Sequence, residues 1–520
     1  MNATVPGQVT ADASGERAEA YEFELKAAQN HLGAEASDLT SLLFFVLQQD
    51  VSREQTQRLL EQAYARLQAL REDDTEPGSN VDDTDISSTI ERAAAALQTG
   101  TAFSLADADE AFEQAYRQCI GNQNHAEFAA RIRVRQAMIA AVMLNFRHAA
   151  ALFAEAAATA GIGPEMQWQY LYWQASVLED LGREFIDIEA LQAAADLYQN
   201  RILPLTPRDQ RPVDWSSVQD RLGTTLGTLG QRQRGTRMLE RAIEAFENSL
   251  TQRDRERTPF DWASTQNNLG NALGILGQRH RDEEMLEKAV AAFDSALQVR
   301  TQAQSPEAWA TTQNNLAAVL LSLGQQNKDA KMLKRAVDAY KALLAVWTRE
   351  RLPFVWGTTM NNLGNALRLL GEHRKGPRTL EQSVAAYNAA LSVRTRARVP
   401  HDWAMTQNNL GAALQMLGER TDDPLVLGRA VAAYRETLKE WTREREPMSW
   451  AMTMANLGVA RCKLAERNQD IDISRRASAD LKMAVDVFRG ASHAQLTELG
   501  EEQLAVSRKL TASLQADTGQ

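Results

Sequence analysis

Residues 259–277 read PFDWASTQNNLGNALGILG, and this stretch predicts a helix that begins at a proline and carries two adjacent asparagines. Proline suits the first turn of a helix because that turn needs no backbone N–H donor. Trp262, Leu269 and Leu273 fall on one stripe at helical spacing, which predicts a buried face. Asparagine is a mediocre helix former, since its amide competes for nearby backbone groups. The pair therefore needs an explanation other than helix propensity.

The same stretch recurs along the chain at a fixed interval. Six tryptophans stand 47 residues apart, and a proline precedes each of them by three residues. The tryptophans are Trp215, Trp262, Trp309, Trp356, Trp403 and Trp450, and the prolines are Pro212, Pro259, Pro306, Pro353, Pro400 and Pro447. Trp168, with Pro164 nearby, marks a looser copy one interval upstream. This self-similarity predicts stacked repeats that bury their apolar faces against their neighbours.

Each copy divides into two helices, which we name helix A and helix B. In the copy at Pro259, Gly277 is expected to end helix A, and the polar segment QRHRDEE (278–284) is expected to form the turn. Helix B then shows one apolar face, made by Leu286, Ala289, Val290, Phe293, Ala296 and Leu297. In the last copy the matching pattern (Leu481, Ala484, Val485, Phe488) comes seven residues late, which predicts an insertion around NQDIDIS (468–474).

Leu269-Gly270 with Leu273, followed by Ala289, Phe293 and Ala296, resembles the signature of the tetratricopeptide repeat (TPR) family. The repeats here are longer, at 47 residues against the family's usual length of about 34. The Asn-Asn-Leu type is similar to the repeats of the kinesin light chain and of bacterial signalling TPR arrays. The resemblance covers residues 125–490, with one copy of ordinary length at 135–161. It implies an all-α TPR-like solenoid, a right-handed superhelix of antiparallel helix pairs with a concave peptide-binding groove.

The asparagines recur at the same places of helix A, and we name the set the asparagine ladder. It comprises Asn267, Asn268, Asn314, Asn315, Asn361, Asn362, Asn408, Asn409 and Asn456, with Asn271 and Asn365 as a second set that Ala318 and Ala412 interrupt. At about 100° per residue, Asn267 and Asn271 lie opposite the apolar stripe and Asn268 lies on its flank. A carboxamide both donates and accepts, so a row of them suits a peptide backbone. The resemblance assigns peptide contact to Asn268 and its equivalents and to the second set.

Positive charge is sparse on this face. The chaperone-tail type of TPR needs cations in the first turn of helix A to bind a C-terminal carboxylate. At these positions the chain has Ser217, Ser264, Thr311, Thr358, Met405 and Met452. Only Arg221 and Arg368 bring positive charge to groove-facing places, so a terminal carboxylate is not the expected ligand. The alternative for the asparagines is structural, because amides in a stack can bridge neighbouring repeats through hydrogen bonds.

Other recurring residues have simpler explanations. The repeat tryptophans share a stripe with leucines and are expected in the core. Trp347 and Trp441 stand where other copies have arginine, and are expected to pack against the link between repeats or to stay partly exposed. The turns QRQRG (231–235), QRHRD (278–282) and EHRKG (372–376) form a basic edge that is either solvated surface or a contact for an acidic partner.

Composition and charge exclude several classes of protein. The 520 residues carry a net charge of −11, and residues 1–120 alone contribute −14, from 22 acidic and 8 basic residues. The nearly neutral remainder is not typical of a dedicated nucleic-acid binder. Two distant cysteines and scattered histidines predict neither a disulfide framework nor a metal site. The sequence has no phosphate-binding loop and no nucleophile elbow. The first 20 residues do not show the basic start and apolar stretch expected of a secretory signal, and the longest apolar run nearby, 39–47, is too short to span a bilayer.

Five parts are predicted along the chain. Residues 1–18 are expected to be disordered, 19–87 to form N-terminal helices and an acidic linker (72–87), and 88–165 a helical region with one TPR-like unit of ordinary length. Residues 166–490 hold the extended repeats, and 491–520 a C-terminal capping helix, predicted over 494–515.

These patterns favour a cytoplasmic, non-enzymatic scaffold or adaptor that binds a protein or peptide partner in its groove, with no cofactor, metal, nucleic acid or membrane. One alternative is a self-assembling scaffold whose N-terminal helices form a homo-oligomer and whose groove is blocked by its own acidic N-terminal segment. A third, weaker hypothesis is an enzyme with its site in residues 1–160.

Overall fold

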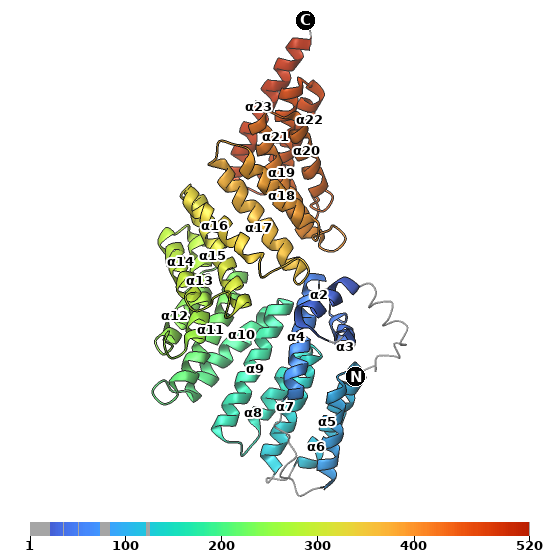
Figure 1. The fold of residues 1–520 in the computed structure, drawn as a ribbon, viewed down its shortest axis with the longest axis vertical. Helices are drawn as coiled ribbons and strands as arrows, with labels where there is room; N and C mark the ends of the chain where they lie inside the picture. Colours follow the sequence, from blue (N-terminus) through green and yellow to red (C-terminus); the bar gives the residue numbers. More distant parts are fainter. Residues whose placement is uncertain are drawn as a thin grey trace. The chain divides into compact units, whose positions relative to one another are not determined.

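The computed structural model describes residues 21–34, 36–49, 51, 53–72, 84–120 and 125–518, and all regular structure in these ranges is helical (Figure 1). The chain divides into two compact units, Met1–Thr312 and Gln313–Gln520, which we describe separately. The all-α prediction is therefore confirmed. The segment 1–18, predicted to be disordered, lies outside the described residues.

The first unit opens with three helices, α2 (Glu22–Leu32), α3 (Ala36–Val46) and α4 (Arg53–Glu72). The apolar run 39–47 is thus largely a helix, and α2 and α3 both pack on α4. α4 in turn packs on α7 (Ala126–Val142) and reaches α9 (Pro164–Phe185). Arg58 and Arg66 of α4 form ion pairs of 2.9 and 2.8 Å with Glu184 and Asp180 of α9. The N-terminal helices are therefore fixed on the same unit.

Two further helix pairs precede the long repeats. Most of the predicted acidic linker, residues 73–83, lies outside the described residues, and α5 begins at Thr84, inside the predicted linker. α5 (Thr84–Thr99) packs on α6 (Ala102–Cys119), which a capping box of Thr101 and Ser104 begins. The predicted unit at 135–161 spans α7 and α8 (Phe146–Ala158), which pack together.

The repeats of the first unit are antiparallel helix pairs whose helix A begins at a proline. They comprise α9 with α10 (Ile188–Leu197), α11 (Pro212–Arg232) with α12 (Arg237–Leu250), and α13 (Pro259–His280) with α14 (Glu283–Leu297). α15 (Pro306–Gln326) contains the boundary between the two units. The predicted helix starts at Pro212, Pro259 and Pro306 are confirmed.

Helix A ends later than predicted. Gly277 lies inside α13, which continues to His280, so the prediction that this glycine ends the helix is wrong. A Cβ at Gly277 would lie 3.0 Å from Leu286 Cγ, so the glycine permits close packing of helix B. The turn is short: Arg281 adopts the left-handed conformation at φ 55°, and Asp282 then caps α14 by accepting from the Met285 amide at 3.1 Å. Asp329, Asp423 and Asp470 cap their helices in the same way.

The link between α10 and α11 contains one extra residue. Tyr198 fills the aromatic place of its repeat and precedes Pro212 by 14 positions (212 − 198), whereas Phe246 precedes Pro259 by 13 (259 − 246). The chain accommodates the extra residue in a π-helix, η2 (Tyr198–Ile202), followed by a 3-10 turn, η3 (Leu203–Leu205).

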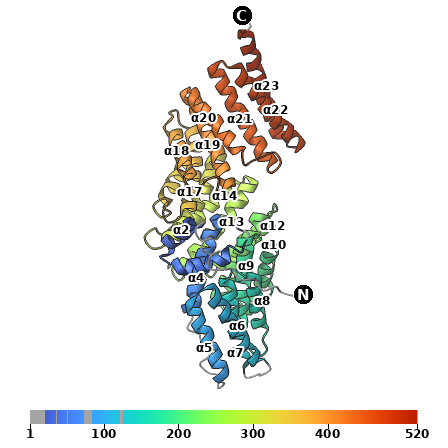
Figure 2. The same cartoon turned by 90° about the vertical axis from the view of Figure 1, so that its right-hand side faces the viewer.

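The second unit continues the pattern. After α15 it contains α16 (Ala330–Leu343), α17 (Pro353–Glu372), α18 (Arg378–Leu391), α19 (Pro400–Thr421), α20 (Pro424–Thr437), α21 (Pro447–Asn468), α22 (Ile471–Gly490) and α23 (Ala494–Thr518). Figure 2 shows α21, α22 and α23 lying side by side, and α23, which covers the helix predicted at 494–515, packs on both others.

The insertion predicted in the last repeat is absent. α22 begins 24 positions after Pro447 (471 − 447), as α14 begins 24 after Pro259 (283 − 259). Leu481 takes the place of the usual aromatic residue, because a Cβ at Gly458 would lie 2.6 Å from Leu481 Cγ just as one at Gly270 would lie 2.9 Å from the Phe293 ring. The apolar pattern looked late because Ser474 stands where Leu286 stands in the repeat at Pro259.

The core of each repeat is an aromatic ring between the two helices. Phe246, Phe293, Tyr340, Tyr387 and Tyr434 are almost fully buried. The repeat tryptophans lie further out: Trp403 is buried, and the other five are half-buried. Arginines from the preceding link lie against several of these indoles, as Arg443 does against Trp450 at 5.8 Å. The prediction that the tryptophans belong to the core is therefore correct only in part.

Candidate functional site

The asparagine ladder lies partly inside the stack. Asn267 and Asn361 are buried, with exposed fractions of 7% and 3%, although the sequence placed Asn267 on an outward face. The geometric reason is that neighbouring helix A elements contact one another, as α11 contacts α13 and α17 contacts α19. A face opposite helix B is therefore not a face open to solvent.

Hydrogen bonds tie several ladder amides to one another and to the next repeat. Asn267 donates to Asn268 at 3.2 Å, and Asn268 donates to Thr224 of α11 at 3.4 Å. In the second unit, Asn361 accepts from Asn409 of α19 at 3.2 Å and donates to Asn362 at 3.3 Å. These contacts support the structural alternative for the buried members of the ladder.

Other ladder residues are half-buried and have varied contacts. Asn408 accepts from Thr453 of the next helix A at 3.4 Å, and Asn365 accepts from the Tyr387 hydroxyl at 2.7 Å. The remaining half-buried members are Asn271, Asn314, Asn315 and Asn456. Water or a ligand therefore has access to part of the ladder only.

Asn268 and Asn271 line one hollow in the first unit. Its volume is about 70 Å³, and Thr224, Thr228 and Gln231 of α11 line it with Ile275 of α13. The hollow therefore combines two ladder amides with hydroxyl, amide and aliphatic groups from the neighbouring helix A. Two of the predicted peptide-binding residues therefore line an open cavity.

The two predicted cations are already paired. Arg221 forms an ion pair with Glu179 of α9 and donates to Ser176 at 3.0 Å, and Tyr198 donates to Glu179 at 3.1 Å. Burial raises the pKa of the Glu179 carboxyl, and the charge of Arg221 opposes that rise. Arg368 pairs with Glu372 at 3.0 Å and is partly exposed. Arg221 therefore links two repeats rather than offering an unmatched charge.

Arginines at the end of helix B also link neighbouring repeats. Arg253 donates to Thr265 of α13 at 2.8 Å and to Ser217 of α11 at 3.2 Å, and Arg394 donates to Thr406 at 3.2 Å and Thr358 at 2.8 Å. In the sequence these arginines stand out only because Trp347 and Trp441 replace them in other copies. The signal that could have revealed them is a helix A Ser or Thr recurring on each side of the link.

The basic edge is partly structural as well. Arg279 donates to the carbonyl oxygens of Gly230 at 2.7 Å and Gly235 at 2.9 Å, and thereby caps the end of the preceding helix A. Arg420 does the same at Gly371, at 2.6 Å. In the second unit a cavity of about 330 Å³ at this edge is lined by Lys334, Lys341, Arg374 and Arg378 among others.

The part of the chain that the structure describes has neither a membrane-spanning helix nor a metal-binding cluster. No described helix is long and apolar enough to cross a membrane. No group of three or more His, Cys, Asp or Glu side chains among the described residues is arranged to hold a metal ion.

Comparison with known proteins identifies the repeats. Residues 262–293 and 309–345 match the family model described as tetratricopeptide repeat. No curated protein matches the chain. The finer resemblance to the kinesin light chain stays a prediction.

Solved structures resemble the chain at low identity. BtubC (BKLC) from P. vanneervenii is 19% identical over 50% of this chain and 93% of that chain, with a TM-score of 0.33. The apo form of RapI is 11% identical over 73% and 97%, with a TM-score of 0.44. A signal-transduction ATPase of the STAND class with a tetratricopeptide repeat sensor, from Pyrococcus horikoshii, is 12% identical over 95% and 74%, with a TM-score of 0.44. These likenesses carry no conclusion about function. On the family match, residues 262–293 and 309–345 are tetratricopeptide repeats.

Proposed function

We propose that the chain is a scaffold that binds a peptide segment of a protein partner along the row of helix A. The observation that carries the proposal is the hollow of about 70 Å³ that Asn268 and Asn271 line together with Thr224 and Thr228. Amides and hydroxyls around one hollow can satisfy both the N–H and the C=O of a peptide group. Repeat stacks also present extended surfaces of this kind.

The accessible part of the ladder is the proposed contact. Asn268 and Asn271 of the first unit are half-buried, as are Asn314, Asn315, Asn362, Asn365, Asn408, Asn409 and Asn456 of the second. Asn267 and Asn361 act as supports for these amides, since both are buried and bonded to the neighbouring asparagine. Arg221 likewise supports the stack rather than the ligand, because it forms an ion pair with Glu179 of α9.

The test begins with peptides selected from a displayed random library on the intact chain. One selected peptide is then titrated by calorimetry against the wild type and against Asn271→Ala. This substitution suits the fold, because Ala318 and Ala412 stand at the equivalent helix positions. Loss of one amide contact worth about 1 kcal/mol weakens binding by about fivefold. Lys288→Ala on α14 is the matched control, since Lys288 is exposed on a helix B.

The proposal requires the affinity to fall in Asn271→Ala and to stay unchanged in Lys288→Ala. A library that yields no peptide above background contradicts it. So does a peptide whose affinity is the same for the wild type and Asn271→Ala.

A further inference from the structure

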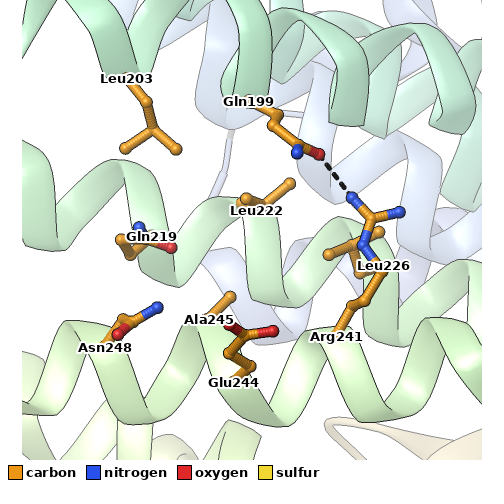
Figure 3. Close-up of a pocket in the computed structure, with 9 residues that line it drawn as sticks. All are labelled: Gln199, Leu203, Gln219, Leu222, Leu226, Arg241, Glu244, Ala245 and Asn248. Carbon is orange, nitrogen blue, oxygen red and sulfur yellow. Dashed lines mark hydrogen bonds between the residues drawn. The ribbon is translucent and has the colours of Figure 1, made fainter.

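A second cavity lies on the other side of α11, in the first unit. Its volume is about 170 Å³, and it is lined by Gln199 and Leu203 of the η2–η3 segment, by Gln219, Leu222 and Leu226 of α11, and by Arg241, Glu244, Ala245 and Asn248 of α12. Figure 3 shows the three α11 side chains between those of the other two elements. At about 100° per residue, Leu222 and Leu226 lie nearly opposite Thr224 and Thr228, so this cavity is separate from the hollow beside Asn271.

The cavity contains amides that the fold does not use. Gln219 is only 8% exposed, yet its side chain has no hydrogen-bond partner among the described residues. The Asn248 amide, on the facing helix, likewise has none within the described ranges. Gln219 is buried and Asn248 is half-buried, and both amides line the cavity, so a ligand seated there can form hydrogen bonds with them.

The extra residue of the α10–α11 link shapes this cavity. It widens the chain into the π-helix η2, which contributes Gln199, and leads into η3, which contributes Leu203. Gln199 accepts a hydrogen bond from Arg241 at 2.5 Å, which fixes one wall (Figure 3). π-helical turns arise from single insertions and are frequent at functional sites.

The size and lining select the class of ligand. A cavity of about 170 Å³ is smaller than the roughly 300 Å³ at which small-molecule sites begin, so it suits one side chain rather than a metabolite. Leu203, Leu222, Leu226 and Ala245 provide aliphatic walls, and Gln219 and Asn248 provide donors and acceptors that match a peptide group.

We propose that this cavity binds an aliphatic side chain of a partner polypeptide, with Gln219 and Asn248 bonded to the peptide groups beside that side chain. The site is additional to the helix A row and does not depend on it. This cavity binds a single aliphatic side chain of the partner, whereas the helix A row contacts the backbone of the partner peptide.

The probe is N-acetyl-leucine N′-methylamide, which carries one leucine side chain between two peptide groups. It is titrated into the full chain with labelled leucine methyl groups, and the signals of Leu203, Leu222 and Leu226 are followed by nuclear magnetic resonance. The glycine analogue lacks the side chain and is expected to bind at least about tenfold more weakly, because burying a leucine side chain stabilises a complex by well over 1 kcal/mol.

The variant is Gln219→Met, which keeps the shape of the side chain and removes its amide. Since the Gln219 amide has no partner in the described part of the fold, the melting temperature stays unchanged while the affinity for the leucine probe falls about fivefold. Gln266→Met is the matched control, at the equivalent place of α13, and leaves the affinity unchanged.

Saturable shifts at the three leucines, weakened by Gln219→Met but not by Gln266→Met, support the proposal. It is overturned if the leucine probe causes no saturable shift, if the glycine analogue binds equally well, or if Gln219→Met binds like the wild type.

Discussion

Two junctions between neighbouring helix A elements solve the same packing problem with different chemistry. Between α9 and α11, the contact is an ion pair of Glu179 with Arg221, with Glu179 only 3% exposed. Between α17 and α19, the contact is a hydrogen bond between the neutral amides of Asn361 and Asn409. Arg221 and Asn409 occupy the same place of their repeats, nine positions after Pro212 and Pro400 (221 − 212, 409 − 400).

In both junctions, residues on this face of helix A form the contacts between neighbouring repeats. A residue there bonds across to the next repeat, and only what the stack leaves accessible is available to a partner. The charged junction is sensitive to the loss of either partner, because a buried charge without its counterion is costly. Removing one partner of the amide junction is expected to lower the free energy of unfolding less, since neutral groups can form hydrogen bonds with water.

The largest effect is expected at the charged junction. Glu179→Gln leaves the Arg221 guanidinium without its counterion and is expected to lower the free energy of unfolding by about 3 kcal/mol. The measurement is urea denaturation followed by circular dichroism.

The double variant Glu179→Gln with Arg221→Gln removes both charges and is the control. It is expected to recover a substantial part of the loss. If Glu179→Gln alone changes the free energy of unfolding by less than about 1 kcal/mol, the junction does not depend on its charges.

A buried cation of the second unit gives a smaller effect. Arg394→Met removes hydrogen bonds to Thr358 and Thr406, but each hydroxyl keeps a bond to a carbonyl of its own helix, at 3.0 and 2.8 Å. We expect a loss of about 2 kcal/mol in the same denaturation experiment.

Arg475→Met is the exposed control, because Arg475 forms a surface ion pair with Asp472, and its change is expected to stay within about 0.5 kcal/mol. Equal effects of the two substitutions would show that Arg394 does not link the repeats.

The amide junction gives the smallest effect. Asn361→Ala removes the acceptor of Asn409 and the donor to Asn362, and is expected to cost about 1 kcal/mol. Asn456→Ala, at a half-buried place of the ladder, is expected to change the free energy of unfolding by less than about 0.5 kcal/mol. If Asn456→Ala costs as much as Asn361→Ala, burial does not separate the supporting amides from the accessible ones.

Much of the fold could be predicted from local rules. Proline in the first helical turn sets the start of each helix A, and the spacing of leucines and aromatic residues sets the face that helix B covers. The sequence does not reveal the start of α22, because Ser474 and Ser478 stand where Leu286 and Val290 stand in the repeat at Pro259. The turn before α14 is shorter than the predicted 278–284, because it depends on Arg281 in a left-handed conformation beside the Asp282 cap, which no apolar pattern reports.

The candidate site was less predictable than the fold. Projection on one helix placed Asn267 opposite the apolar stripe, but burial of that face depends on the helix A of the adjacent repeat. The cavity beside Gln219 depends on one extra residue in the α10–α11 link, which alters a spacing by a single position. Both features arise from contacts between repeats, which the pattern within one repeat does not contain.

The most direct measurement compares Asn271→Ala with Asn361→Ala in one experiment that follows both stability and affinity for a library-selected peptide. We expect Asn361→Ala to lower the free energy of unfolding by about 1 kcal/mol and to leave the affinity for the peptide unchanged. We expect Asn271→Ala to leave the free energy of unfolding unchanged and to weaken binding of the peptide about fivefold. The opposite pattern, or a loss of affinity in Asn361→Ala with none in Asn271→Ala, would contradict the division of the ladder into supporting and binding amides.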